Sequence, residues 1–277
     1  MQADYPLKVL CETFDVSRSG YYAWRDRGPS SRQQVDGQLS QQIQSIHAQS
    51  RHSYGSPRVH YQLQQAGVSC SRKRVARLMR QQQLCGRKPR RFVPSTTDSR
   101  HDEPIAPNHL KGFSVERPNQ AWAVDITYVP TAEGWLYLAG VLDLCSRRLV
   151  GWSFDDTLAT SLPAAALRMA QTQRCPPPGL IHHSDRGSQY ASGEYRRALE
   201  AGELTPSMSR RACCYDNATM ESFWSTLKCE LIYRCQFATR IQAQQIIFEW
   251  IEVFYNRTRL HSALGYKSPV DFENQLN

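Results

Sequence analysis

Apolar positions in the first third of the chain recur every three or four residues, which is the period of an amphipathic helix. The positions that show it are Leu39, Ile43, Ile46 and His47, then Val59 and Leu63, then Val75, Leu78 and Met79. They predict helices at about 36 to 50, 57 to 66 and 71 to 83. A shorter helical pair is expected before them, at about 6 to 14 and 17 to 27, in which the rings of Tyr21, Tyr22 and Trp24 pack in a core rather than stack on bases.

The break GVSCS at 67 to 71 separates the second and third of these helices and makes Ser71 the N-cap of the third. That helix, RKRVARLMR, carries Arg72, Arg74, Arg77 and Arg80 beside its apolar stripe. Two helices joined by a short break, the second of them basic, are typical of a helix-turn-helix unit that faces DNA. The pattern leaves open whether the basic helix reads bases or only grips phosphates.

A proline-rich stretch interrupts the helical pattern. Residues 87 to 119 contain Pro89, Pro94, Pro104, Pro107 and Pro118, too many for a continuous helix or a central strand. The stretch therefore predicts a linker, and its first part, RKPRRFVP, is basic enough to run along DNA. A second domain is expected to begin near Asn119.

Beyond the linker the pattern changes to alternating strands and helices. Strands are predicted at about 121 to 129, 135 to 144, 148 to 154, 180 to 184 and 204 to 208. Helices are predicted at about 160 to 173 and 193 to 202, followed by two longer helices. The order β, β, β, α, β, α, β, α, α resembles the ribonuclease-H-like α/β fold, a mixed five-stranded sheet with helices on both faces.

Charge divides the chain more sharply than hydropathy does. Residues 1 to 110 hold 17 Lys and Arg against 8 Asp and Glu, so the formal charge of +9 belongs to this part, and no acid lies between Asp36 and Asp98. Such a concentration of positive charge repels itself unless a polyanion is near, and double-stranded DNA is the expected partner. The alternative is a solvated basic face without a ligand. The predicted contacts are Arg58, Arg72, Lys73, Arg74, Arg77, Arg80, Arg87, Lys88, Arg90 and Arg91.

Cysteine content and hydropathy bear on location. The nine cysteines are odd in number and form no CxxC pair, which suits a reducing compartment. No segment reaches 18 uncharged apolar residues, and the first residues show no signal-peptide pattern. A soluble, cytoplasmic protein without a membrane contact is expected.

Three acids in different local contexts suggest a metal site. Asp125 lies within AWAVDITYV, Asp185 within HHSDRGSQY and Glu221 within DNATMESFWSTLKCEL, with 35 residues between the last two. Carboxylates are the ligands that hard divalent cations prefer. On a helix, Glu221 and Lys228 fall on one side, beside the apolar arc, because seven residues make nearly two turns. Asp216 or Asn217 is expected to cap this helix.

Other polar residues leave alternatives open. Asp143 could face the same site, although it is expected to hold the SRR turn that follows it. His183 could orient a phosphate or satisfy a strand end. A C-terminal group could touch DNA or tether the last helix to the core; its members are Tyr255, Asn256, Arg259, His261 and Gly265.

These motifs resemble the catalytic reading frame, OrfB, of insertion-sequence transposases, whose core is similar to that of retroviral integrases. The resemblance runs from SRSGYYAWR to YNRTRLHSALGYKSP. It implies that Asp125, Asp185 and Glu221 are catalytic acids that hold Mg²⁺ or Mn²⁺, with two ions expected, and that Lys228 contacts the DNA. The implied reaction is metal-dependent cleavage at the element ends, followed by strand transfer through attack of a 3′-hydroxyl.

The same resemblance implies a homo-oligomer on DNA, within the bacterial nucleoid, and a possible partner or fusion encoded by an upstream frame. Four parts are expected: a helical segment over 1–35, a basic helix-turn-helix region over 36–86, a linker over 87–118 and a catalytic core with C-terminal helices over 119–277. Two other functions compete with transposition. One is a ribonuclease-H-like nuclease that only hydrolyses, and the other is a non-catalytic DNA-binding protein derived from a transposase.

Overall fold

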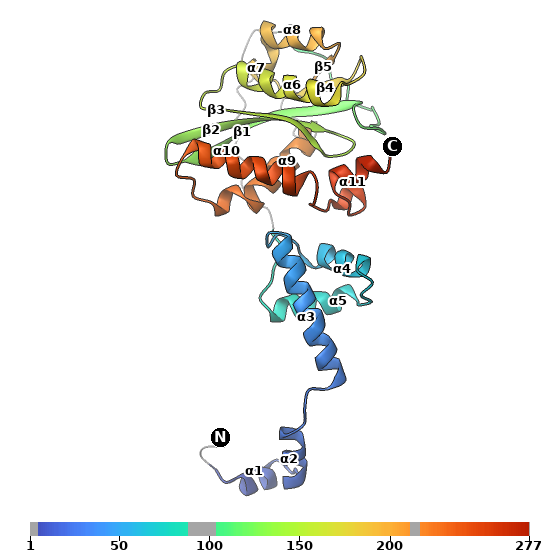
Figure 1. The fold of residues 1–277 in the computed structure, drawn as a ribbon, viewed down its shortest axis with the longest axis vertical. Coiled ribbons are helices and arrows are strands. Elements are labelled where there is room, and N and C mark those ends of the chain that lie inside the picture. Colours follow the sequence, from blue (N-terminus) through green and yellow to red (C-terminus); the bar gives the residue numbers. More distant parts are fainter. Residues whose placement is uncertain (1–4, 88–103, 211–216, 277) are drawn as a thin grey trace.

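The computed structural model describes residues 5–87, 104–210 and 217–276. A helical hairpin, a three-helix unit and a larger α/β unit follow one another along the long axis (Figure 1). Among the described residues no helix is long and apolar enough to cross a membrane. The predicted features at Lys88, Arg90, Arg91 and Asp216 fall outside the described residues.

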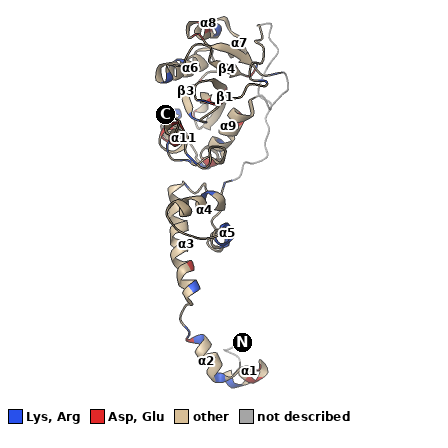
Figure 2. Cartoon of the chain, turned by 90° about the vertical axis from the view of Figure 1, so that its right-hand side faces the viewer, with Lys and Arg blue, Asp and Glu red and all other residues tan. Residues whose placement is uncertain are grey.

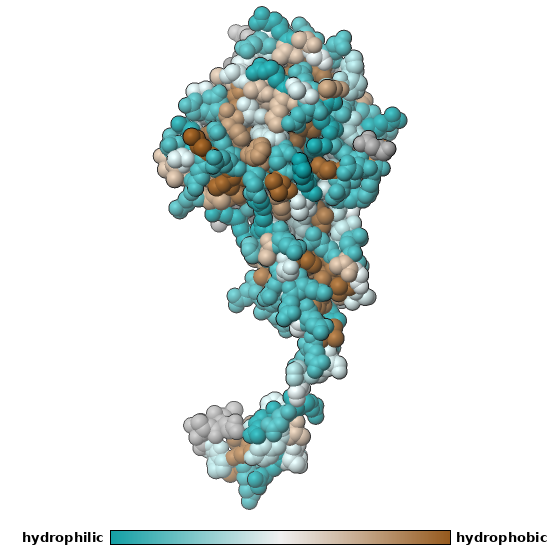
Figure 3. Space-filling model, viewed as in Figure 1, coloured by the Kyte–Doolittle hydropathy of each residue, from teal (hydrophilic) through white to brown (hydrophobic). Residues whose placement is uncertain are grey.

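The N-terminal hairpin consists of α1 (Leu7–Thr13) and α2 (Arg18–Arg25), close to the predicted bounds. The prediction that the aromatic rings of this hairpin pack in a core is wrong, since Tyr22 and Trp24 are 39% and 67% exposed. Two helices of 7 and 8 residues are too short to enclose these rings, and Cys11 is the only described hairpin residue that is buried. Figure 3 shows apolar atoms at the surface of the hairpin.

The three-helix unit contains α3 (Ser31–Gln49), α4 (Ser56–Gln65) and α5 (Arg72–Gln81). Its core is the predicted apolar set, Leu39, Ile43, Val59, Leu63, Val75, Leu78 and Met79. Ser71 caps α5 as expected, because its side chain accepts a hydrogen bond from the Arg74 N–H. Helix α3 begins earlier than predicted because Ser30 and Gln33 form a capping box ahead of the apolar pattern.

The α/β unit is built on a mixed five-stranded sheet, as the sequence predicts, with strand order β3-β2-β1-β4-β5. Strands β1 (Ala121–Thr131), β2 (Gly134–Asp143) and β3 (Leu149–Asp155) are antiparallel. Strands β4 (Ile181–Ser184) and β5 (Thr205–Met208) are parallel to β1. The short strand β4 therefore lies beside the much longer β1 at the centre of the sheet, and β5 forms the edge.

Helices cover both faces of the sheet (Figure 1). One layer holds α6 (Ser161–Arg174), α7 (Ser188–Ala191) and α8 (Gly193–Ala201). The other holds α9 (Ala218–Glu230), η2 (Ile232–Arg234), α10 (Arg240–Glu249) and the π-helical η3 (Trp250–Tyr255), followed by η4 (Ser262–Leu264) and α11 (Pro269–Asn274). Side chains alternate between the layers along β1, with Trp122 and Val124 in one core and Ala123 and Val129 in the other.

Candidate active site

The shortness of β4 brings Asp125 and Asp185 together. Residues 181–183 of β4 pair with residues 121–123 of β1, and β4 ends at Ser184. Continuing that parallel register places Asp185 level with Asp125, where the edge of β1 is free of β4. Burial, followed by the negative charge of Asp185, raises the pKa of Asp125 to about 7. The two carboxylates thus repel each other across the end of β4.

Both acids are held by nearby N–H groups. The Ile126 backbone N–H donates to Oδ1 of Asp125 at 2.8 Å. The Trp224 indole N–H donates to Oδ2 of Asp125 at 3.1 Å. For Asp185, the backbone N–H of Gly187 donates to Oδ1 at 2.9 Å. These bonds orient each carboxylate.

Trp224 is a site residue that the sequence analysis missed. Its ring is 5% exposed and lies against Gly140, the residue opposite Asp125 on β2. A Cβ at Gly140 would come within 3.0 Å of the Trp224 ring, so the glycine makes room for the indole beside the carboxylate. The available signal was helical spacing, since Trp224 lies three residues after Glu221 and four before Lys228.

Glu221 lies in the first turn of α9, the helix that carries Trp224. Its negative charge contributes to the raised pKa of Asp125, after burial and Asp185. The Glu221 side chain nevertheless stays exposed, and within the described ranges no three His, Cys, Asp or Glu side chains are grouped closely enough to hold one metal ion. Asn217 occupies the N-cap position of α9, but the predicted cap bond is absent because its side-chain amide points to the Val124 carbonyl, 3.5 Å away.

Lys228 lies on the same side of α9 and is directed toward β1. Its Nζ is 5.0 Å from the centre of the Tyr128 ring. Burial lowers the pKa of Lys228, and the negative charge of Asp125 acts in the opposite direction. Lys228 is therefore close enough to Asp125 for the charge of that carboxylate to affect the pKa of the lysine.

The predicted DNA contacts divide into three groups. Arg72, Lys73 and Arg80 are exposed on α5, where Figure 2 shows basic residues. Arg74 and Arg77 instead contact Asp36 of α3, with N–O distances of 2.7 and 2.6 Å. Arg58 and Arg87 lie at the junction between the three-helix unit and the α/β unit. The Asp36 pairing was not foreseen, because the acid is 38 residues from its nearer partner.

Two of the open alternatives are answered by hydrogen bonds. Asp143 is fully buried, and its carboxylate accepts from the backbone N–H groups of Asn119, Cys145 and Ser146. It therefore holds the turn after β2, as expected. His183 is also buried, and its two ring nitrogens are 2.9 and 3.0 Å from the hydroxyls of Ser207 and Ser209. The histidine satisfies the end of a strand.

The C-terminal group tethers the chain to the core. The Asn256 amide makes two 3.0 Å hydrogen bonds with the backbone N–H and C=O of Leu149 on β3. Arg259 is 5% exposed and forms a double hydrogen bond with Glu230 at the end of α9. Burial, together with the adjacent Arg259 charge, lowers the pKa of His261 to about 2. Arg259 is therefore structural and not exposed to DNA, whereas His261 is only partly buried.

We expect Trp224→Phe to raise the metal concentration needed for half-maximal activity by about tenfold to a hundredfold, the cost typical of losing an outer-shell hydrogen bond. The phenyl ring fills most of the indole space but donates nothing to Asp125. Trp250→Phe is the matched control, because the Trp250 indole N–H is buried without a partner in the described structure. An equal metal requirement in the two variants would leave Trp224 with a packing role alone.

Comparisons with known proteins cover nearly the whole chain. The integrase core domain family matches residues 115–214, a second integrase core domain family matches residues 203–269, and the HTH-like domain family matches residues 34–92. The uncharacterized 31 kDa protein of insertion element IS600 from Shigella sonnei is 45% identical over 97% of this chain and 98% of its own length. Transposase InsF for insertion sequence IS3A from Escherichia coli K12 is 40% identical over 99% of this chain and 96% of its own length.

Two solved structures are also similar. A chain of the simian T-cell lymphotropic virus intasome, solved in complex with PP2A regulatory subunit B56 gamma, gives a TM-score of 0.49 at 13% identity, covering 83% of this chain and 74% of that chain. The HTLV-2 integrase catalytic core domain in complex with magnesium gives a TM-score of 0.45 at 14% identity, covering 58% of this chain and 99% of that chain.

Proposed function

Because the chain belongs to the family of insertion-sequence transposases that includes IS3 InsF, we propose that Asp125, Asp185 and Glu221 are the acids with which it cuts and joins DNA. The protein is a transposase with an integrase core, a polynucleotidyl transferase of the DDE class. The observation that supports the assignment of the acids is the pairing of Asp125 and Asp185 at the end of β4, with the Glu221 helix packed above them.

The residues at this site fit a divalent metal. Asp125 and Asp185 offer hard oxygen donors whose mutual repulsion a cation would relieve. Asp125 and Asp185 would hold Mg²⁺ or Mn²⁺, and Glu221 would complete a second position. When bound, a pair of such ions stabilises the attacking and leaving oxygens of an in-line displacement.

The roles of the other residues follow from their contacts. Trp224 keeps the Asp125 carboxylate oriented through its indole N–H. Lys228, on the same side of α9, holds the DNA phosphate next to the acids. Water cuts a phosphodiester at the element end, and the freed 3′-hydroxyl then attacks a second phosphodiester. The cut releases a 3′-hydroxyl and a 5′-phosphate, and the joining step forms one phosphodiester for the one that it breaks, so no nucleotide cofactor is required.

We assign a role to each of the four parts of the chain that the sequence predicts. The segment 1–35 is a helical appendage, 36–86 is the DNA-binding helix-turn-helix region, 87–118 is a linker and 119–277 is the catalytic core. Double-stranded DNA at the element ends and at the target is the partner. The working form is a homo-oligomer on DNA in the bacterial cytoplasm.

A strand-transfer assay tests this function. The purified protein is incubated with duplexes that carry the inverted repeats flanking its gene, in Mg²⁺ and in Mn²⁺. We expect nicked ends and joined products. Hydrolysis without joining would indicate a ribonuclease-H-like nuclease, and binding without cleavage in either metal would indicate a non-catalytic DNA-binding protein.

We expect Lys228→Ala to lower strand transfer by about tenfold to a hundredfold, the range in which a misplaced reacting group costs rate. Affinity for end DNA should change much less, because one of many basic residues is lost. Lys111→Ala is the control, since Lys111 is an exposed lysine with no predicted role in the site. Equal transfer rates for the two variants would reduce Lys228 to a surface residue.

A further inference from the structure

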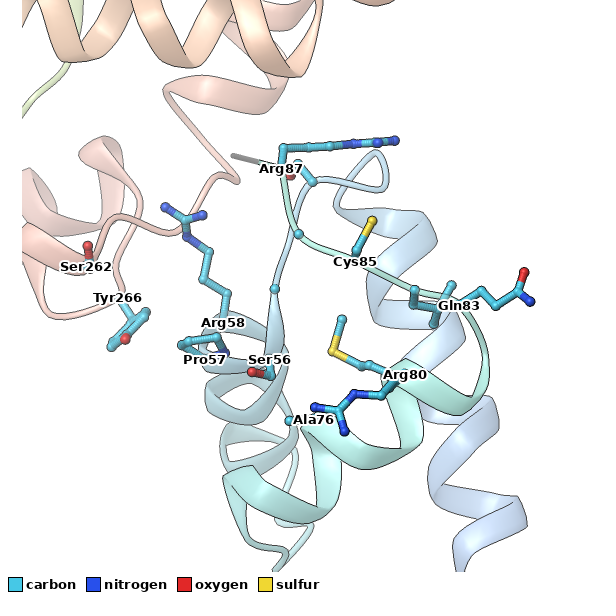
Figure 4. A pocket seen from close by; sticks show the side chains of 15 residues that line it. Ser56, Pro57, Arg58, Ala76, Arg80, Gln83, Cys85, Arg87, Ser262 and Tyr266 are labelled. Carbon is cyan, nitrogen blue, oxygen red and sulfur yellow. The ribbon is translucent and has the colours of Figure 1, made fainter. Parts of the chain in front are cut away.

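A groove of about 810 Å³ lies between the three-helix unit and the C-terminal part of the integrase core. Arg58 of α4 and Arg80 of α5 line it together with Gln83 and Arg87 of the segment that follows α5. Ser262 and Tyr266 of the integrase core form the opposite wall (Figure 4). The groove is thus built by two regions that are far apart in the sequence.

The groove carries positive charge without a matching acid. Arg58, Arg80 and Arg87 are its charged lining residues, and none of the described residues that line it is acidic. The Nε of Arg87 is buried and has no hydrogen-bond partner in the described structure. Burial, together with the like charge of Arg259, lowers the pKa of Arg58. Partly buried guanidinium groups of this kind are relieved by an anion.

Direct contacts hold the two walls of the groove together. The hydroxyl of Tyr54 accepts a 2.7 Å hydrogen bond from the Leu260 N–H, and Nε of Arg58 donates to the Leu260 carbonyl at 2.9 Å. The Tyr61 ring stacks on Tyr266 at 5.0 Å. Within the wall formed by the three-helix unit, the backbone packs tightly, since a Cβ at Gly86 would lie 2.6 Å from the backbone of Gly55. The groove is therefore preformed, which lowers the entropic cost of binding.

We propose that this groove binds the sugar-phosphate backbone of the element-end duplex, so that DNA is gripped at the junction of the two regions and not by α5 alone. The groove is far larger than one phosphate ion requires, and its three arginines lie on separate elements, which allows contacts to more than one phosphate. Arg234 of η2 is close enough to Arg87 for their charges to repel, which extends the positive surface onto the core. This inference rests on the proposed function, because it takes element-end DNA as the substrate.

The first test is DNA affinity as a function of salt, measured by fluorescence anisotropy with the full chain and an element-end duplex. We expect the double variant Arg80→Gln, Arg87→Gln to bind about tenfold more weakly at moderate salt. The slope of log K against log salt should fall by about 1.8, since each phosphate contact contributes about 0.9. The control is Arg168→Gln, Arg197→Gln, which removes the same charge from exposed positions on the opposite face of the sheet.

The second test places a photo-crosslinking amino acid at Gln83, inside the groove, or at Arg197, outside it. Crosslinks to the duplex at position 83 and none at 197 are expected, and inorganic phosphate at millimolar concentration should not compete. Unchanged affinity and slope in the groove variant, an equal loss in the control variant, or no crosslink at 83 would each overturn the proposal. Strand transfer by the unmodified protein is scored separately, so a failure of the catalytic assignment is distinguishable from a failure of the groove.

Discussion

The amide variants Asp125→Asn, Asp185→Asn and Glu221→Gln are each expected to lose both cleavage and strand transfer, by about a thousandfold or more. A metal stabilises the charge of the transition state by several kcal/mol, and each 1.36 kcal/mol corresponds to a factor of ten in rate. Because the amides remove a ligand and not a DNA contact, affinity for end DNA should survive in all three. Single-turnover cleavage and joining are measured in Mg²⁺ and in Mn²⁺.

The comparison variant is Asp143→Asn, since Asp143 also lies in the sheet. Its carboxylate holds the turn after β2 through backbone N–H groups. Asp143→Asn should therefore lower stability while metal-dependent activity remains. Activity that survives in Asp125→Asn and disappears in Asp143→Asn would move the first ligand to β2 and contradict the proposed triad.

The melting temperature of the metal-free protein tests whether the inactive variants are folded. Burial and Asp185 raise the pKa of Asp125 to about 7, above the unfolded value of about 3.9. The folded state therefore holds a proton that the unfolded state releases, and stability falls as the pH rises from about 4 to about 7. We expect metal-free Asp125→Asn to melt a few degrees above the unmodified protein at pH 8, with no difference at pH 4.

Breaking the buried pair of Arg259 and Glu230 is expected to cost about 3 to 5 kcal/mol of stability, because one charge is left buried without its partner. Both side chains are 6% exposed, and two hydrogen bonds of 2.9 and 2.7 Å join them. Arg259→Met and Glu230→Gln should each lower the free energy of unfolding, measured by urea titration, by this amount. Replacing both residues by apolar ones should recover much of the loss.

The ion pair between Arg51 and Glu249 is the comparison, since its side chains are 33% and 50% exposed and it is therefore much less buried than the pair of Arg259 and Glu230. Glu249→Gln should cost less than about 1 kcal/mol. A similarly small cost for Arg259→Met would show that Arg259 is not a structural residue and would return it to the candidate DNA contacts.

Local patterns in the sequence were sufficient for much of the fold. The five strands follow from short apolar runs separated by turns, and the Ser71 cap follows from its place before an amphipathic run. The strands and the cap depend on residues that are close together in the chain. The nearness of Asp125 and Asp185, which are far apart in the chain, was expected only from the resemblance to the ribonuclease-H-like fold.

Features that depend on distant residues were missed. Trp224 reaches Asp125 across 99 residues and fits only because Gly140, on another strand, has no side chain. Asp36 pairs with Arg74 although both lie in a region read as simply basic. The prediction of a core around the N-terminal rings was wrong for a different reason. The local pattern suggested a core, but two short helices cannot enclose one.

The contacts between the three-helix unit and the integrase core indicate how domains of related transposases could be exchanged by design. Tyr54 and Arg58 recognise the main chain of residues 258 and 260 and not their side chains. These hydrogen bonds do not depend on which side chain stands at either position, although the Leu260 side chain also packs against the core. The three-helix unit of a relative should dock on this core if it keeps a tyrosine, an arginine and a stacking ring at the positions of Tyr54, Arg58 and Tyr61. Specificity for the element end could then be transferred between relatives by exchanging this unit.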